Sequence, residues 1–126
     1  IGMDTDADAI KAAHKKLAHI PHCKLIKGDG TQSGLAAESI DLFLANLPFG
    51  KQYGDKKTNP RLYSKLLAEM ARLGVSTRWR AVLLSSDVEA VESALASETG
   101  LRCEKRLRIK VRGEWAHIFL VRPSKD

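Results

Sequence analysis

The chain has 126 residues, 44% of them hydrophobic and 29% charged, which is enough for one domain with a buried core. Its 21 Lys and Arg residues outnumber 15 Asp and Glu residues, and this net charge of +6 modestly favours a polyanionic partner. No apolar run approaches the roughly 20 residues of a transmembrane helix, and Cys23 and Cys103 indicate buried free thiols of a reducing compartment, here the cytoplasm, rather than a disulfide framework.

The first 30 residues predict a strand end, a helix and a second short strand. Thr5 or Asp6 is positioned to cap the helix, and its apolar residues recur at helical spacing on one face. The segment "CKLIKGDG", residues 23–30, predicts a short strand that ends in glycines.

The middle of the chain predicts a second strand–helix pair. The run "SIDLFLANLPF", residues 39–49, is mostly apolar, as in a parallel strand covered on both faces. After a loop, a helix is expected from about Arg61, with Pro60 near its first turn and Gly74 at its end. Its apolar stripe is Leu62, Leu66, Met70 and Leu73.

Residues 80–100 predict a third buried strand followed by a helix. "RAVLLSS" forms the strand, and Ser86 with Glu89 three residues later matches a capping box at the start of the helix. The alternation of strands and helices indicates an α/β fold with a mostly parallel sheet.

The last quarter predicts an antiparallel hairpin with Gly113 at its turn. In residues 101–123 an alternating strand with a basic outer face precedes an almost wholly apolar strand, "WAHIFLV". The apolar strand is expected inside the sheet and the basic strand at its edge. The basic stripe fits either RNA binding or protection of the edge against aggregation, and consists of Arg106, Arg108, Lys110 and Arg112.

Three polar clusters follow the parallel strands, where open α/β sheets bind ligands. Asp4 follows the first strand and Asp29 the second; helix capping and an ordinary Gly-Asp-Gly turn are the alternative roles of these two residues. The third cluster, Asn46 to Phe49, is the most specific. An Asn oxygen can accept a hydrogen bond from an exocyclic amine, a rigid Pro can direct a neighbouring carbonyl to the same nitrogen, and a Phe ring can stack on a base.

These residues resemble a known family. "NLPFG" resembles the [ND]-[LP]-P-[FY] motif of S-adenosylmethionine-dependent amino-methyltransferases, which also occurs in enzymes that act on DNA and on protein glutamine. The longer run over residues 28–73 resembles RNA methyltransferases that carry THUMP domains and modify guanine N2 in tRNA. "GMDTDADAI" is similar to the ribose-binding motif of that family, and residues 108–123 resemble its final hairpin.

The resemblance implies a Rossmann-like methyltransferase sheet with a C-terminal antiparallel hairpin, and S-adenosylmethionine as cofactor. Asp4 would hold the ribose of the cofactor, and Asp29 beside Gly30 would hold its adenine amine. Asn46, which also borders the cofactor, and the Leu47 carbonyl would orient the target amine in the turn fixed by Pro48. Phe49 would stack on a flipped-out base.

The family pattern also has a first strand and a Gly-rich turn that bind the methionine part of the cofactor, and neither is found in residues 1–126. The expectation is therefore a single partial catalytic domain, the C-terminal portion of a longer protein. In that fold the first strand lies between the strands that end at Asp4 and Asn46, so the fragment alone is expected to be inactive and to bind the cofactor negligibly. A degenerate descendant that lost catalysis is the alternative.

Other residues leave further possibilities open. Near the motif, Lys51, Lys56, Lys57 and Arg61 either contact RNA phosphates or are solvated. The spacing of His14, His19, His22 and Cys23 does not favour a metal site. A tRNA methyltransferase is the favoured function, with a non-catalytic binding remnant or a DNA adenine-N6 methyltransferase as alternatives. A small zinc-binding activator subunit, as some relatives use, is a conceivable partner.

Overall fold

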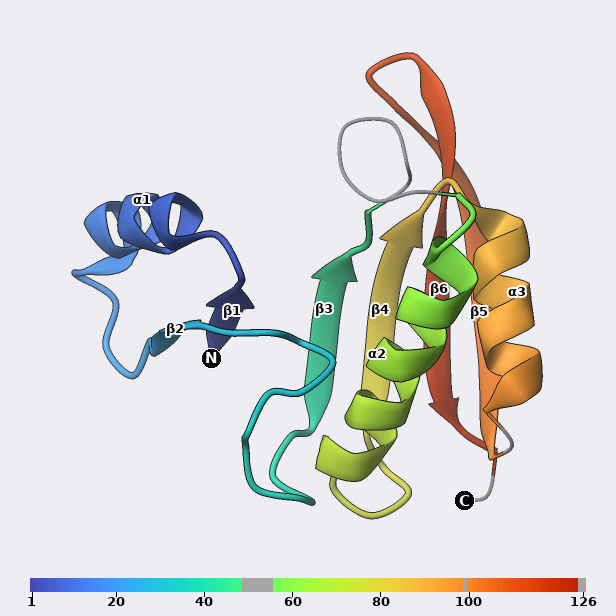
Figure 1. The fold of residues 1–126 in the computed structure, drawn as a ribbon, viewed down its shortest axis with the longest axis horizontal. Coiled ribbons are helices and arrows are strands. Elements are labelled where there is room, and N and C mark those ends of the chain that lie inside the picture. Colours follow the sequence, from blue (N-terminus) through green and yellow to red (C-terminus); the bar gives the residue numbers. More distant parts are fainter. Residues whose placement is uncertain (49–55, 99, 125–126) are drawn as a thin grey trace. The chain divides into compact units, whose positions relative to one another are not determined.

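The fold was analysed in a computed structural model that describes residues 1–48, 56–98 and 100–124. The chain divides into two compact units, residues 1–34 and 35–126, which are treated separately below. Figure 1 shows the helices and strands of both units. No helix in the described ranges is long and apolar enough to cross a membrane.

Unit 1 contains one helix and two short parallel strands. They are β1 (Gly2–Asp4), α1 (Ala7–Leu17) and β2 (Leu25–Lys27). The Asp6 carboxylate caps α1 by accepting a hydrogen bond of 2.9 Å from the backbone N–H of Asp8, which confirms one of the two expected caps.

Unit 2 contains a four-stranded mixed sheet with the strand order β3-β4-β6-β5. Two helices lie on one face of this sheet (Figure 1). The elements of unit 2 are β3 (Leu42–Asn46), α2 (Asn59–Leu73), β4 (Arg80–Ser85), α3 (Val88–Ser97), β5 (Leu101–Val111) and β6 (Glu114–Pro123).

The helices cover the sheet through an apolar core. Tyr63 and Leu67 of α2 and Val91 of α3 are buried against alternate residues of β4 and β6. Trp79 is 2% exposed and meets the Phe43 ring edge-on at a centroid distance of 5.5 Å. This arrangement fixes α2 and α3 above the sheet and places their N-terminal ends near the carboxyl ends of β3 and β4.

The end of α2 depends on a close approach between backbone and ring. Gly74 is the C-cap of α2, as predicted, and its N–H donates to the Met70 carbonyl at 2.8 Å. A Cβ atom at this position would lie 2.1 Å from Cδ1 of Trp79. The Trp79 ring therefore occupies the space that any larger residue than glycine would need.

The predicted cap of α3 is wrong by one residue. Asp87, not Ser86, precedes the helix, and its carboxylate accepts a hydrogen bond of 3.2 Å from the Ala90 N–H. A buried aspartate can serve this role because the N-terminal end of a helix favours negative charge. Ser86 instead lies in the short connection between β4 and α3.

The C-terminal hairpin is confirmed, with one correction. β6 lies inside the sheet, antiparallel to β4 and β5, and β5 forms the edge. Arg112 was expected on the strand but lies in the turn, where Arg112 and Gly113 have φ values of 51° and 80°. Two successive positive φ angles match the two-residue turn that suits the twist of a hairpin.

Three further expectations need correction. β3 is not covered on both faces, because α2 and α3 lie on one face; Leu42 and Leu44 of the other face are 56% and 74% exposed. The α/β class is confirmed, but the mostly parallel sheet is matched only in part: the two-stranded sheet of unit 1 is parallel, whereas the four-stranded sheet of unit 2 has one parallel and two antiparallel pairs. Cys23 and Cys103 are free, but both are exposed, since neither lies on a core-facing position.

Candidate active site

The segment Asn46–Pro48 leaves the sheet of unit 2 at the carboxyl end of β3. Asn46 is the last residue of β3 and pairs with Leu84 of β4. The Leu47 N–H then donates to the Leu84 carbonyl at 2.9 Å, and the Leu47 side chain is buried in the core. The residues before and after Asn46 in the chain are thus both attached to β4.

A directed chain of hydrogen bonds holds the following turn. The Tyr63 hydroxyl lies 2.5 Å from the Pro48 carbonyl oxygen and 2.9 Å from Oγ of Ser85, and the Asp87 N–H donates to the same Oγ at 3.0 Å. A carbonyl only accepts, so the single Tyr63 proton goes to Pro48, and the Ser85 hydroxyl must donate to Tyr63. The order of donation is therefore Asp87 to Ser85 to Tyr63 to Pro48.

Burial keeps the Tyr63 phenol, in the middle of this series of hydrogen bonds, protonated. Tyr63 and Ser85 are almost completely inaccessible to solvent. Desolvation raises the pKa of the Tyr63 phenol, and the nearby Asp87 carboxylate raises it further, although the Ser85 hydrogen bond opposes the shift. Tyr63 is consequently a neutral donor to Pro48 at physiological pH.

A second buried contact supports the same region. The Asn59 side-chain amide donates to Oδ2 of Asp87 at 3.1 Å, while Oδ1 of Asp87 caps α3. Asn59 is the first residue of α2 and is completely buried. The N-terminal ends of α2 and α3 are thereby joined to each other and to the end of β4.

The acceptors that the sequence assigned to the target amine are available. Among the described residues, neither the Asn46 side chain nor the Leu47 carbonyl takes part in a hydrogen bond. Asn46 is exposed, whereas the Pro48 carbonyl is already occupied by Tyr63. The turn therefore contains a side-chain oxygen and a backbone carbonyl without a hydrogen-bond partner among the described residues, and both groups can accept hydrogen bonds from an amine.

In unit 1, Asp4 and Asp29 lie at the same edge of the small parallel sheet. Asp4 ends β1, Asp29 follows β2, and the Gly28 N–H donates to the Asp4 carbonyl at 2.9 Å. Oδ1 of Asp4 accepts from the Asp6 N–H at 2.8 Å, and Oδ1 of Asp29 accepts from the Thr31 N–H at 2.8 Å. Asp29 thus has its alternative role in a local turn, whereas Asp4 does not cap α1, because Asp6 is the cap. Oδ2 of Asp4 remains without a partner among the described residues.

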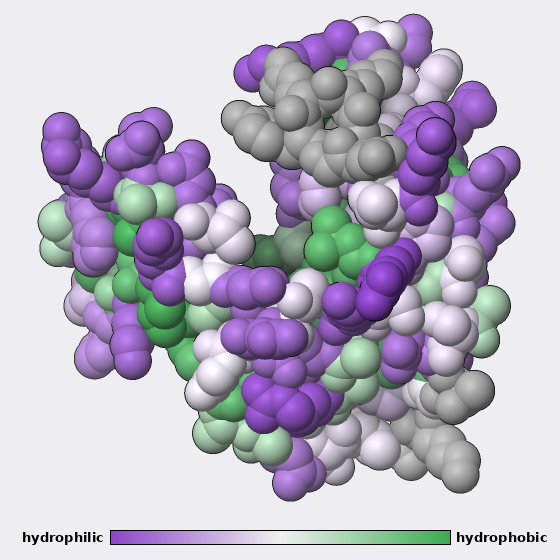
Figure 2. Space-filling model, viewed as in Figure 1, coloured by the Kyte–Doolittle hydropathy of each residue, from purple (hydrophilic) through white to green (hydrophobic). Residues whose placement is uncertain are grey.

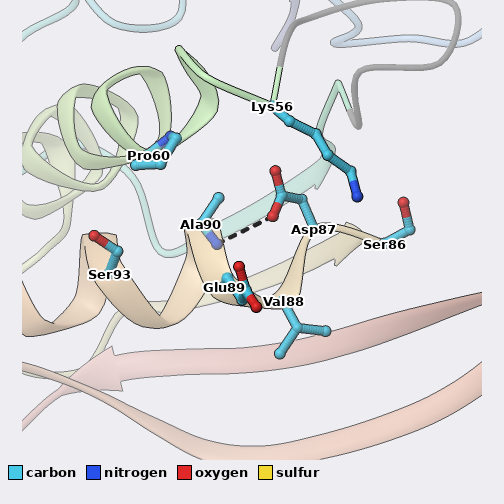
Figure 3. A pocket seen from close by; sticks show the side chains of 8 residues that line it. All are labelled: Lys56, Pro60, Ser86, Asp87, Val88, Glu89, Ala90 and Ser93. Carbon is cyan, nitrogen blue, oxygen red and sulfur yellow. Dashed lines mark hydrogen bonds between the residues drawn. The ribbon is translucent and has the colours of Figure 1, made fainter.

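A pocket of about 530 Å³ lies beside the N-terminal ends of α2 and α3. Figure 3 shows Asp87 at its centre, with its hydrogen bond to Ala90 and with Lys56 on one side. Neither Asn46 nor Pro48 lines this pocket, so it is distinct from the candidate amine site. It is lined by Lys56, Pro60, Ser86, Asp87, Val88, Glu89, Ala90 and Ser93.

The structure brings together only part of the set predicted from sequence. Asn46, Leu47 and Pro48 form one turn of unit 2, while Asp4, Asp29 and Gly30 belong to unit 1. Phe49 and Lys51 lie outside the described residues. Of the basic residues, Lys56 and Lys57 precede Thr58, the N-cap residue of α2, and Arg106, Arg108 and Lys110 share one face of β5.

Sequence reasoning missed the residues that hold the motif turn. The sequence patterns described above do not indicate Tyr63, Asn59 or Ser85 as part of the site. A polar residue at a buried helical position, such as Tyr63 within an apolar stripe, was the available signal. In the described part of the chain, no group of three or more His, Cys, Asp or Glu residues could hold a metal ion.

Comparison with known proteins gives a family and several relatives. Residues 1–117 match the family described as RMKL-like, methyltransferase domain. The chain is 44% identical over 62 residues to the Homo sapiens tRNA (guanine(6)-N(2))-methyltransferase THUMP3, covering 49% of this chain and 12% of that protein. To the Bos taurus protein of the same name it is 34% identical over 89 residues, which cover 70% of this chain and 18% of that protein. The chain thus spans less than a fifth of the length of these relatives.

Solved structures share the fold. TrmN from Thermus thermophilus has a TM-score of 0.83 at 19% identity and covers 96% of this chain and 35% of its own. The N-methyltransferase NodS from Bradyrhizobium japonicum, in complex with S-adenosyl-L-homocysteine, has a TM-score of 0.70 at 15% identity. The match covers 98% of this chain and 65% of the NodS chain. At these identities the likeness establishes a Rossmann-like methyltransferase fold.

Proposed function

This chain belongs to the RMKL-like methyltransferase domain family, and from that premise we propose that it is part of an enzyme that methylates an exocyclic amine of an RNA base. The expected family is confirmed, and S-adenosylmethionine is the cofactor that it implies. The finer proposal is guanine N2 of a tRNA, supported by the relatives whose names state a tRNA guanine-N2 activity.

The observation that carries the proposal is the anchored turn after β3. Tyr63 occupies the Pro48 carbonyl, while the Asn46 amide oxygen and the Leu47 carbonyl stay available at the edge of the sheet. An aromatic amine has two N–H groups, which these two acceptors suit. Hydrogen bonds to both would turn the nitrogen lone pair toward an electrophile, since the N–H bonds fix the orientation of the amine.

The residues present also fit the cofactor. When bound, S-adenosylmethionine supplies an electrophilic methyl group on a sulfonium sulfur. Asp4 would accept hydrogen bonds from the ribose hydroxyls through Oδ2, and Asp29 with Gly30 would face the adenine amine. Both carboxylates stand at the carboxyl edge of parallel strands, where such nucleotide contacts are made.

The chemistry asked of the protein is mainly positioning. Asn46 and Leu47 would hold the target amine with its nitrogen directed at the methyl group that the cofactor supplies, and the methylated nitrogen would release one proton to solvent. Asn46 and Leu47 would stabilise the partial positive charge that develops on the N–H groups, because both oxygens carry partial negative charge and are fixed beforehand. Phe49 as the stacking residue for the base stays a prediction.

Partners and location are part of the same proposal. The net charge of +6 supports an RNA substrate. A cytoplasmic location fits two free cysteines, although their exposure leaves them open to oxidation elsewhere. A zinc-binding activator subunit stays a prediction.

Mass spectrometry of RNA nucleosides tests the function in the cell. Deletion of the gene should remove N2-methylguanosine from a purified tRNA fraction, and expression of the full-length protein should restore it. If deletion instead removes N6-methyladenine from DNA, the RNA assignment is wrong. If no methylated nucleoside changes, the family member is not a nucleic-acid methyltransferase.

A further inference from the structure

The β5–β6 hairpin extends beyond the rest of the sheet at the edge that carries the candidate active site. Ser85, the last residue of β4, pairs with His117, and His117 pairs with Arg108. The pair Lys110–Trp115 lies two residues further toward the turn, about 7 Å past the end of β4. Because β5 runs parallel to β3 and β4, this extension projects from the same edge as Asn46 (Figure 1).

The hairpin carries most of the net charge of the chain. Residues 101–123 contain seven Lys and Arg against two Glu, a net charge of +5 within a chain of +6. Two of its cations are neutralised: Arg106 pairs with Glu92 at 2.9 Å, and Arg122 pairs with Glu104 at 3.0 Å. Figure 2 shows hydrophilic residues along the end of unit 2 at which the hairpin turns.

Near the turn, two cations lie against an exposed aromatic ring instead of a carboxylate. Cζ of Arg108 is 4.0 Å and Nζ of Lys110 is 5.0 Å from the centroid of Trp115. Within the described ranges, neither cation has an ion-pair partner. Trp115 is 51% exposed, whereas Trp79, the other tryptophan, is buried.

Protection of the edge strand explains the charges but not the ring. Lysine and arginine alone keep an edge strand from pairing with another chain, and an exposed tryptophan works against that purpose. An aromatic ring with adjacent Arg and Lys is the combination that binds single-stranded nucleic acid, because bases stack on the ring and cations meet phosphates. The charge and the ring together therefore favour RNA over an acidic protein.

We infer that Trp115, Arg108 and Lys110 form a stacking platform for an unpaired nucleotide next to the base that enters the candidate active site. Trp115 on β6 is two strands from β3, roughly 10 Å across the sheet, and Arg108 and Lys110 on β5 are three strands from it, roughly 14 Å, distances that two or three nucleotides span. Trp115 would stack on the flanking base, with Arg108 and Lys110 on its phosphates. This inference rests on the proposed function for the identity of the nucleic acid.

The test measures binding of a single-stranded RNA 12-mer to the full-length protein by fluorescence anisotropy, without methyl transfer. Trp115→Ala should weaken binding about 10-fold, and Trp115→Phe should restore most of it because stacking survives. Arg108→Gln with Lys110→Gln should flatten the salt slope by about 1.4, the value for two contacts with a single strand. The matched control, Arg102→Gln with Lys105→Gln, removes the same charge from the other end of β5 and should leave base-dependent binding intact.

A second readout separates stacking from charge. RNA should quench the emission of Trp115, and polyphosphate, which has no bases, should not. Equal binding of polyglutamate and RNA, both insensitive to Trp115→Ala, would overturn the inference in favour of an acidic protein partner. If Trp115→Ala binds RNA as tightly as wild type and still methylates it, the platform is refuted and the proposed function stands. If Trp115→Ala loses RNA binding but the wild-type protein methylates no RNA, the proposed function is refuted and the platform stands.

Discussion

The Tyr63 hydroxyl donates a 2.5 Å hydrogen bond to the carbonyl oxygen of Pro48, 15 residues earlier in the chain. Through this contact a buried side chain of α2 determines the path of the turn that follows β3. Because the Pro48 carbonyl is occupied, the Asn46 side chain and the Leu47 carbonyl are the acceptors left for a ligand.

Tyr63→Phe should remove the anchor and leave the core nearly filled. We expect the full-length protein to lose about 1–2 kcal/mol in free energy of unfolding, because a buried carbonyl and the Ser85 hydroxyl each lose a partner. We also expect kcat for methylation to fall while KM for the cofactor stays constant. Urea denaturation and steady-state kinetics measure the two effects.

Ser85→Ala is the matched control for that change. It also deletes one buried hydroxyl, but the hydrogen bond from Tyr63 to Pro48 can remain. It should therefore cost stability with a smaller loss of kcat. Equal losses of kcat in both variants would mean that the turn does not depend on the Tyr63 contact.

The stability of the protein should depend on the titration of Tyr63 at alkaline pH. Burial raises the pKa of this phenol above its ordinary value of 10.0, so the folded state holds the proton more strongly than the unfolded state. The resulting stability is fully present below pH 10 and is lost as the pH rises through the folded-state pKa. The stability difference between wild type and Tyr63→Phe should thus shrink above pH 10 in urea titrations, and a constant difference from pH 8 to 11 would contradict the burial argument.

Gly74→Ala should destabilise unit 2 through the Trp79 ring. The added Cβ would lie 2.1 Å from Cδ1 of Trp79, which is packed against Phe43 and cannot move freely. A loss of about 1–3 kcal/mol is expected from such overpacking. Gly28→Ala is the control, since its Cβ would meet only the flexible end of Met3 at 3.2 Å; thermal denaturation that ranks Gly28→Ala as the more harmful change would contradict the packing.

Asp4→Ala should weaken cofactor binding. A carboxylate that accepts from a ribose hydroxyl contributes a charged hydrogen bond, so its loss should raise Kd about 10-fold or more in calorimetry. Asp8→Ala, which removes another acid from the first turn of α1, is the control and should leave Kd unchanged. Similar Kd values for wild type and Asp4→Ala would leave the Asp4 carboxylate with only its observed role, acceptance from Asp6 N–H.

The order of the helices and strands was predictable because each has a recognisable pattern of apolar and turn residues in its own segment. The apolar alternation and the glycine of residues 101–123 were enough to predict the hairpin, including the basic edge strand. The motif at Asn46–Pro48 was predictable from residue types and a family resemblance. Which face of β3 the helices cover was not predictable. The strand is apolar throughout, as in a strand buried on both faces, and only the structure shows that Leu42 and Leu44 are exposed.

The hydrogen-bond chain could not be predicted either. Tyr63, Ser85 and Asp87 come from an α-helix, a strand end and a cap, and no local pattern relates such distant positions. The shift of the α3 cap from Ser86 to Asp87 has a similar cause. Both residues are good caps, and the contact that Asp87 makes with Asn59, 28 residues away in the chain, cannot be seen from the local sequence.

Methylation of an unmodified tRNA transcript by purified full-length protein, wild type and Asn46→Ala, tests the central claim most directly. With labelled S-adenosylmethionine and mass spectrometry of the nucleosides, wild type should produce N2-methylguanosine. Asn46→Ala should be at least about 100-fold slower, the scale of losing one preorganised electrostatic contact, while cofactor affinity changes much less. Full activity of Asn46→Ala, or no methylated guanosine from wild type, would contradict the account.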